Sequence, residues 1–163
     1  MALTLPLALA LAMTSPVPHA APHGSTGCAD VPRTMPDRPV AAAISRVPNL
    51  STLTGGIDAT GLAAELDGAP QVTVFAPANE AFDKLGEPQA VTFDPAVLRY
   101  HVVPQRLAPD QLVGTHRTLH GGELSVAGGG ARFKVNATAG LICTRIQAAN
   151  GNVYLIDTVL TPR

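Results

Sequence analysis

The stretch Thr73-Val-Phe-Ala-Pro-Ala-Asn-Glu-Ala-Phe-Asp-Lys-Leu85 decides the fold predicted for this chain. Its opening residues are β-branched, aromatic or small and favour a strand. Pro77 turns the chain, and Phe82 and Leu85 then recur three residues apart, which places both on one face of a helix. The stretch therefore predicts a strand that passes directly into a helix.

Two further segments extend the pattern toward the C-terminus. Asp94 is an N-cap candidate followed by Pro at the first helical position, and the short helix that they begin runs into β-branched residues before Pro104. The stretch 150–160 opens with Asn-Gly, which suits a two-residue hairpin turn, and continues as an apolar strand. We expect the last strand to close the sheet.

The two halves of the chain differ in hydrophobic spacing. Between residues 40 and 66, apolar residues recur at helical spacing and are interrupted by Pro and Gly. From Thr118 onward, short apolar runs are separated by clusters of Gly, Asn or Ala, and Gly128 to Gly130 marks one turn. These patterns predict an α+β fold, with short helices in the first half and strands in the second.

Length and composition indicate a single domain and exclude some classes of partner. The chain has 163 residues, of which 46% are hydrophobic and 14% charged, which suits a single domain with its own core. The formal net charge is -1, and the basic residues are scattered rather than gathered into the stripe of a nucleic-acid-binding protein. We expect no nucleic-acid partner, and no segment of the mature chain is long enough to span a membrane.

The N-terminal residues indicate the compartment. Leu3 to Met13 form an apolar run too short for a membrane-spanning helix, and small residues follow at Ala20 and Ala21. We interpret residues 1–21 as a signal peptide, because Pro6 opposes the alternative of a buried N-terminal helix. This predicts a secreted, extracellular protein, with the bacterial cell envelope as a second possible location, and an extended arm over residues 22–39.

Cys28 and Cys143 are the two cysteines of the chain. Two thiols in an exported protein usually form one bridge, so we predict a disulfide that ties the arm to the domain. Lipidation of Cys28 is the alternative, because small residues precede that cysteine as they do in a bacterial lipoprotein signal. Ser25 stands where such a signal has Leu or Val, which favours the disulfide.

Taken together, the three segments resemble the fasciclin (FAS1) domain. Its first homology box corresponds to residues 73–85, its Tyr-His motif to Tyr100 and His101, and its second box to residues 150–160. The resemblance implies a single FAS1 domain over residues 40–163, in which a helical N-terminal half packs on a wedge-like β-sandwich formed mainly by the C-terminal half. Within the family, the chain is similar to small secreted mycobacterial antigens that carry cysteines at corresponding places.

One residue departs from the family pattern. Ala78 stands where many relatives have a Ser or Thr that caps the helix. Loss of such a cap costs about 0.5 to 2 kcal/mol unless Asn79 caps the helix instead.

The resemblance also implies a function. Fasciclin domains take part in adhesion and bind matrix or cell-surface proteins, and some animal members use the Tyr-His region in integrin recognition. Tyr100 and His101 are therefore candidate binding residues, and Asp157, an acid between the apolar residues Ile156 and Val159, is a third. We expect a monomer with an extracellular or cell-surface protein partner. Each of the three residues has an alternative interior role, Tyr100 and His101 as core side chains and Asp157 as a hydrogen-bond hub.

Sequence motifs for catalysis are absent. The chain has no nucleophile elbow, no HExxH and no phosphate-binding glycine loop. His116 and His120 are four residues apart across a predicted strand and turn, where this spacing gives no common helical face for a metal. We expect no enzyme activity, no cofactor and no metal. Two other roles stay open, an envelope-associated structural or sensor component that binds a partner of its own cell, and a carrier of small ligands.

Overall fold

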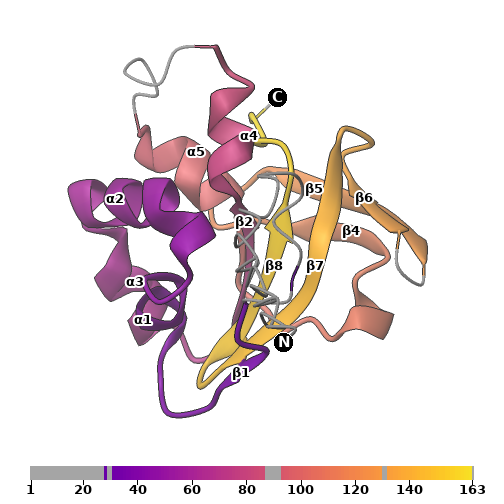
Figure 1. The fold of residues 1–163 in the computed structure, drawn as a ribbon. Helices are drawn as coiled ribbons and strands as arrows, with labels where there is room; N and C mark the ends of the chain where they lie inside the picture. The colour runs from indigo at the N-terminus through magenta and orange to yellow at the C-terminus, as the bar shows by residue number, and fades with distance from the viewer. Residues whose placement is uncertain (1–27, 29–30, 87–92, 130–131, 163) are drawn as a thin grey trace, which may run out of the picture.

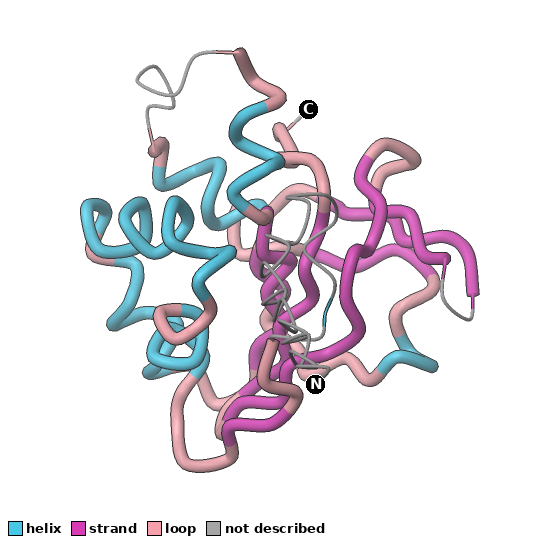
Figure 2. Tube along the Cα trace, in the orientation of Figure 1, coloured by secondary structure: helices cyan, strands magenta, loops and turns pink. Residues whose placement is uncertain are grey.

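The computed structural model describes residue 28 and residues 31–86, 93–129 and 132–162. The predicted signal peptide, residues 1–21, and Gly130 of the predicted turn lie outside these residues. Helices occupy mainly the first half and strands the second, and the helices gather on one side of a bent sheet (Figure 1, Figure 2). The prediction of an α+β fold is confirmed.

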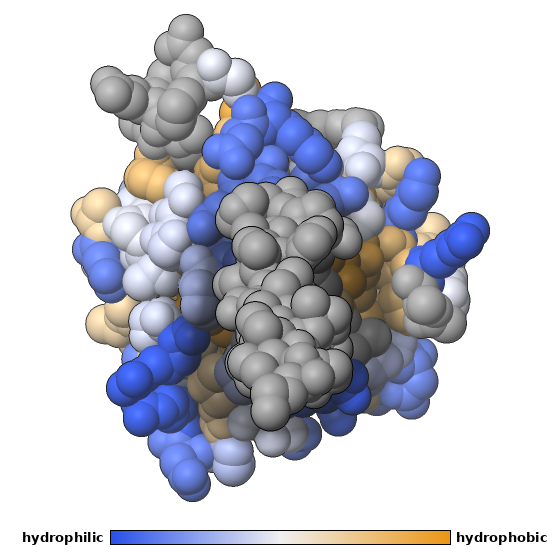
Figure 3. Space-filling model, in the orientation of Figure 1, coloured by the Kyte–Doolittle hydropathy of each residue, from blue (hydrophilic) through white to orange (hydrophobic). Residues whose placement is uncertain are grey.

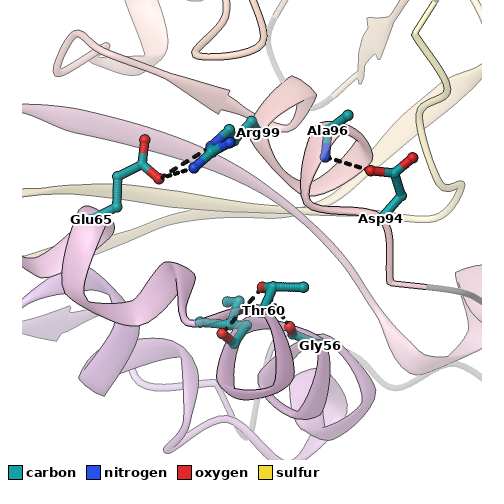
Figure 4. Close-up of polar contacts among 7 residues, drawn as sticks. Gly56, Thr60, Glu65, Asp94, Ala96 and Arg99 are labelled. Carbon is teal, nitrogen blue, oxygen red and sulfur yellow. Dashed lines mark hydrogen bonds and ion pairs between the residues drawn. The ribbon is translucent and has the colours of Figure 1, made fainter.

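Short helices form the layer on one side of the sheet. They are α1 (Val40–Ile44), η2 (Pro48–Leu50), α2 (Ser51–Thr60), α3 (Leu62–Gly68), α4 (Asn79–Asp83) and α5 (Pro95–Tyr100), while η3 (Pro109–Gln111) follows later in the chain. α2 ends at Thr60 and is capped by Gly61, whose φ of 70° is the left-handed conformation that glycine adopts without a steric penalty. α5 begins as predicted, because the Asp94 carboxylate accepts a hydrogen bond from the Ala96 N–H at 2.8 Å (Figure 4).

The strands form one continuous path. They are β1 (Thr34–Met35), β2 (Val72–Pro77), β3 (Val102–Val103), β4 (Gly114–Arg117), β5 (Glu123–Gly129), β6 (Arg132–Val135), β7 (Ala139–Ala148) and β8 (Gly151–Ile156). Their order is β3-β2-β8-β7-β6-β5-β4, with β1 paired to β7. β2 and β8 are parallel neighbours and are buried along their whole length, which explains their continuous apolar sequences.

The sheet contributes to two hydrophobic cores because its side chains alternate between faces. On β8, Val153 and Leu155 pack in the core beneath the helices, whereas Tyr154 and Ile156 pack in the second core. The second core contains Phe75, Tyr100, Val103, Leu107, Leu112, Leu124, Val126, Phe133, Val135, Ala139, Tyr154, Ile156 and Leu160. The second core therefore lies largely among strands of the C-terminal half, as the resemblance implies.

The hairpin between β7 and β8 lies one residue earlier than predicted. β7 ends at Ala148 and β8 begins at Gly151, so the two linking residues are Ala149 and Asn150. Gly151 does not have a positive φ; a Cβ at this position would collide with the carbonyl oxygen of Val72. Close approach of the β2 backbone, rather than turn geometry, requires this glycine.

Asn79 caps a different helix from the one that it begins. Ala78, at the N-cap of α4, makes no side-chain hydrogen bond. The Asn79 Oδ1 instead accepts a hydrogen bond from the Thr52 N–H at 3.0 Å, in the first turn of α2. Of the two possibilities left open by the sequence, Asn79 does not replace the missing cap of α4, because its side chain is bonded to a neighbouring helix.

The predicted disulfide is confirmed. Cys28 and Cys143 are joined, with their Cα atoms 5.5 Å apart. The part of the arm that follows is held by the sheet, since β1 pairs with β7 in parallel and the Arg33 carbonyl accepts a hydrogen bond from the Gln147 N–H at 2.9 Å. The arm is thus fixed to the domain by one covalent bond and by strand pairing.

Candidate functional site

Tyr100 joins α5 to the outer strands. Its side chain is only 3% exposed, and its hydroxyl donates to the Glu123 carbonyl and accepts from the Asn136 Nδ2, both at 2.9 Å. The ring also makes an edge-to-face contact with His120, with centroids 5.9 Å apart. Both hydrogen-bonding capacities of the hydroxyl are used inside the protein.

His101 fastens the C-terminal segment to α5. Its ring is 1% exposed, with Nδ1 lying 2.8 Å from the Val97 carbonyl oxygen and Nε2 accepting from the Leu160 N–H at 2.9 Å. Because the Leu160 N–H can only donate, Nδ1 carries the proton and donates to Val97. Burial lowers the pKa of His101 from 6.5 to about 4, against a smaller opposing effect of the Val97 bond, so the ring is neutral at neutral pH.

Asp157 follows β8 and lies at the surface. Its Oδ1 accepts from the Gly140 N–H at 2.8 Å and from the Thr158 hydroxyl at 2.9 Å. Lys84 approaches from α4, donates to the Asp157 carbonyl at 2.8 Å and lies 3.9 Å from Oδ2. With 41% of its side chain exposed, Asp157 combines internal hydrogen bonds with access to a partner.

The three predicted residues do not share one site. His101 borders an apolar cavity of about 20 Å³, which is little more than the space for one water molecule. Asp157 borders a separate hollow of about 210 Å³ beside Lys84 and Leu155. Tyr100 borders a third and larger hollow of about 430 Å³. A contact role for these residues remains a prediction, and the structure gives each of them a different surrounding.

The largest of these hollows crosses the outer strands and is called here the β4–β5 groove. It is lined by Tyr100, Thr115, Gly122, Glu123, Ser125, Ala127, Asn136 and Ala137. Tyr100 lies so close that a Cβ at Gly122 would lie 3.1 Å from its ring. Glu123 is the one charged residue of this lining.

Asn136 supports the groove and was not among the residues predicted from sequence. Its φ is 51° and that of Ala137 is 60°, a conformation that Asn adopts more readily than other non-glycine residues. The Asn136 Oδ1 accepts from the Ser125 N–H at 2.9 Å while its Nδ2 donates to Tyr100. The only sequence signal was an Asn between two short strands, which is typical of a turn but does not identify its partners.

Comparison with known proteins decides the family. The family model of the Fasciclin domain matches residues 48–162. This chain belongs to the fasciclin family. The cell surface glycolipoprotein MPB83 of Mycobacterium bovis is 42% identical over 142 residues, which cover 78% of this chain and 62% of that protein. The immunogenic protein MPT70 of Mycobacterium tuberculosis is 39% identical over 151 residues, covering 84% of this chain and 75% of that protein.

A solved structure supports the same fold. The FAS1 domain pair from the insect cell adhesion molecule fasciclin I superposes with a TM-score of 0.67 at 17% sequence identity, covering 77% of this chain and 51% of that one. This fasciclin chain thus has the FAS1 fold predicted from its three segments. It spans less than two thirds of the length of MPB83.

On the face drawn in Figure 3, hydrophilic residues lie in several separate groups rather than in one continuous patch. Within the described ranges, no three His, Cys, Asp or Glu side chains gather in a way that could hold a metal ion. None of the helices in the described part of the chain has the length and apolar character needed to cross a bilayer.

Proposed function

We propose that this fasciclin chain is an extracellular binding module that mediates adhesion or protein–protein binding at a cell surface or matrix, without catalysis. Family membership carries the proposal, because the related MPB83 is named as a cell surface protein and the solved FAS1 pair comes from a cell adhesion molecule. In this proposal the protein is monomeric and its partner is a protein.

The geometry supports a rigid scaffold with contact residues at its surface. The polar atoms of Tyr100 and His101 are bonded internally, so these rings hold elements in place. Asp157 is partly exposed, which leaves it within reach of a partner, whereas Tyr100 is 3% exposed and forms part of the wall of the β4–β5 groove. We therefore propose a contact role for Asp157 and positioning roles for Tyr100 and His101.

The proposed location is outside the cell, after removal of residues 1–21, with residues 22–39 as the arm and residues 40–163 as the domain. A disulfide supports export, because such bonds persist in oxidising compartments. The bond also uses the Cys28 sulfur that an acyl chain would need. It therefore favours a soluble secreted form over the alternative of a lipoprotein anchored through Cys28.

The binding proposal is tested with the secreted chain on two kinds of surface. The first consists of purified matrix proteins and intact host cells, and the second of envelope fractions of the producing cell. Saturable binding to the first surface is expected, and Asp157→Asn, which removes a charge but keeps an acceptor, measures the contribution of that residue. Binding only to the envelope supports the structural or sensor role instead. If neither surface retains the protein while soluble metabolites raise its melting temperature, the small-ligand role replaces both.

A further inference from the structure

The chain contains a single Asn-Gly sequence, Asn150-Gly151, at the turn between β7 and β8. This sequence is chemically reactive, because the nitrogen of the following residue can attack the amide carbon of an Asn side chain. Glycine favours the attack, since it has no side chain to block the approach and its backbone rotates most freely. The other asparagines of the chain are followed by residues with side chains, namely Leu50, Glu80, Ala137 and Val153. Asn150 is therefore the asparagine most prone to this reaction.

The reaction is a deamidation, which exchanges the side-chain amide for a carboxylate. The Gly151 nitrogen bonds to Cγ of Asn150 and gives up its proton, while the Cγ–Nδ2 bond breaks and the amide nitrogen leaves with that proton as ammonia. Water then opens the resulting cyclic imide, a succinimide, at either of its carbonyl carbons. The product at position 150 is an aspartyl or an isoaspartyl residue. The net change consumes one water molecule and releases one ammonia molecule, and it needs no other reactant.

The folded structure holds the leaving group in place. The Asn150 Nδ2 donates to the carbonyls of Leu66 at 2.8 Å and Ala69 at 2.9 Å, at the end of α3. The Oδ1 of the same side chain accepts from the Val40 N–H at 2.9 Å, at the start of α1. Departure of the amide nitrogen therefore breaks two hydrogen bonds, and rotation of the side chain toward the main chain breaks the bond to Val40 as well.

The attacking group is held in place as well. Gly151 is buried and lies opposite Val72 in the parallel register of β2 and β8. The Val72 N–H donates to the Asn150 carbonyl at 3.1 Å, and a Cβ at Gly151 would collide with the Val72 carbonyl oxygen. Contact with β2 thus restrains the main chain on both sides of the Asn150–Gly151 peptide bond. Ring closure requires the hairpin to open first, and a local opening of this kind has a cost in free energy.

The products fit this junction less well than asparagine does. An ionised aspartyl side chain has no N–H, so its carboxylate oxygens would face the carbonyl oxygens of Leu66 and Ala69. These carbonyls would lose their donor, which is costly for groups away from water. An isoaspartyl residue instead adds a methylene to the main chain beside Gly151, where the Val72 backbone leaves no spare room. Either product weakens the junction between α1, α3 and the β7–β8 hairpin.

We propose that Asn150-Gly151 is a deamidation site, which the folded chain suppresses and which reacts when the β7–β8 hairpin opens. The reaction converts a reversible opening into a permanent loss of stability, because the product cannot restore the bonds to Leu66 and Ala69. The site thereby limits the lifetime of the folded protein. None of its residues lines the β4–β5 groove, and the inference does not depend on the proposed binding function.

Deamidation rates of the full secreted chain, with its disulfide intact, test the site. The chain is incubated in mildly alkaline buffer, with and without guanidinium chloride above the unfolding midpoint. It is then digested and analysed by mass spectrometry with a separation that resolves the Asn, Asp and isoaspartyl peptides. We expect Asn150 to react at least about tenfold faster in the unfolded chain than in the folded chain. Asn49, which precedes Leu50, is the internal control and is expected to react more slowly than Asn150 in the unfolded chain.

The variant Asn150→Asp tests the consequence of the reaction. It reproduces the aspartyl product and is expected to lower the melting temperature of the protein. Asn49→Asp, the same change at a half-buried position, is the matched control and is expected to leave the melting temperature nearly unchanged. Wild-type chain that is deamidated while unfolded provides a second measurement. After refolding, its modified fraction is expected to melt at a lower temperature than its unmodified fraction.

Any of three results would overturn the proposal. The first is deamidation of Asn150 at the same rate in the folded and the unfolded chain, because the fold would then give no protection. The second is an unfolded chain in which Asn150 reacts no faster than Asn49. The third is a deamidated chain, or the variant Asn150→Asp, that melts at the same temperature as the unmodified protein.

Discussion

At the scale of single residues, Tyr100 and His101 are buried side chains whose hydrogen bonds hold α5 to other elements. Tyr100 connects α5 to β5 and to the turn after β6, while His101 connects the same helix to the segment after β8. The sequence identified both residues through the motif but left their role open, because a buried ring and an exposed ring look the same in sequence. Their partners at positions 123, 136 and 160 are distant in the chain and become neighbours only in the fold.

The buried imidazole of His101 predicts a pH dependence of stability. In the unfolded chain His101 takes up a proton as the pH falls below about 6.5, whereas in the folded chain it does so only near pH 4. The free energy of unfolding therefore decreases as the pH falls from about 6.5 to 4, by roughly 3 kcal/mol from this residue. Urea unfolding across this range measures the change. In the variant His101→Gln, whose side chain does not titrate, the free energy of unfolding is expected to depend less on pH than in the wild type. An equal dependence on pH contradicts the prediction.

Removing the Tyr100 hydroxyl tests the hydrogen bonds that link α5 to β5 and to the turn after β6. Tyr100→Phe leaves the Glu123 carbonyl and the Asn136 amide without that partner, and is expected to lower the free energy of unfolding by about 1 to 3 kcal/mol. Tyr154→Phe is the matched control, because the Leu107 carbonyl keeps a second donor in Asn152. Chemical denaturation measures the free energy of unfolding of both variants. A larger loss of stability in Tyr154→Phe than in Tyr100→Phe would contradict the prediction.

At the scale of elements, local patterns predicted strands and helices better than the contacts between them. The helix after Asp94 was predicted correctly because capping depends on residues close in sequence. The hairpin was placed one residue late because Gly151 is required by contact with Val72, 79 positions away, which no local pattern shows. The place of β4 at the end of the strand order could not be predicted either, since the position of a strand in a sheet depends on the order of all strands.

Ion pairs between elements contribute little here. Glu65 on α3 and Arg99 on α5 form a bond of 3.0 Å (Figure 4), but 40% and 45% of their side chains are exposed. Exposed pairs of this kind stabilise proteins by about 0 to 1 kcal/mol. Apolar burial and side-chain bonds to the backbone are therefore the main links between the helical layer and the sheet.

The Asn150 side chain makes three such bonds to the backbone. Its Oδ1 accepts from the Val40 N–H at the start of α1, and its Nδ2 donates to the carbonyls of Leu66 and Ala69 at the end of α3. Asn150→Ala removes three hydrogen bonds and is expected to cost about 2 to 4 kcal/mol. Asn49→Ala, at a half-buried surface position, is the control and is expected to cost less than about 1 kcal/mol. Thermal and urea unfolding of both variants measure the difference, and equal losses would contradict this role.

At the scale of the whole molecule, the disulfide closes the chain over 115 positions and fixes the arm to β7. On the chain-entropy account, a loop of this length contributes about 4 to 5 kcal/mol. The double variant Cys28→Ala with Cys143→Ala is therefore expected to unfold at a lower temperature than the oxidised protein. Reduced wild-type protein is expected to resemble the variant. If the double variant and the reduced wild-type protein both melt at the same temperature as the oxidised protein, strand pairing alone holds the arm.

The central claim is that this fasciclin chain acts outside the cell as a soluble, disulfide-closed binding module. The intact mass of the secreted protein, measured with and without reduction and alkylation, tests it most directly. The account predicts a mature chain that begins near Ala21 or Pro22 and has both thiols blocked until reduction. A mass that begins at Cys28 and includes added acyl chains would contradict it, because the protein would then be a membrane-anchored lipoprotein without this disulfide.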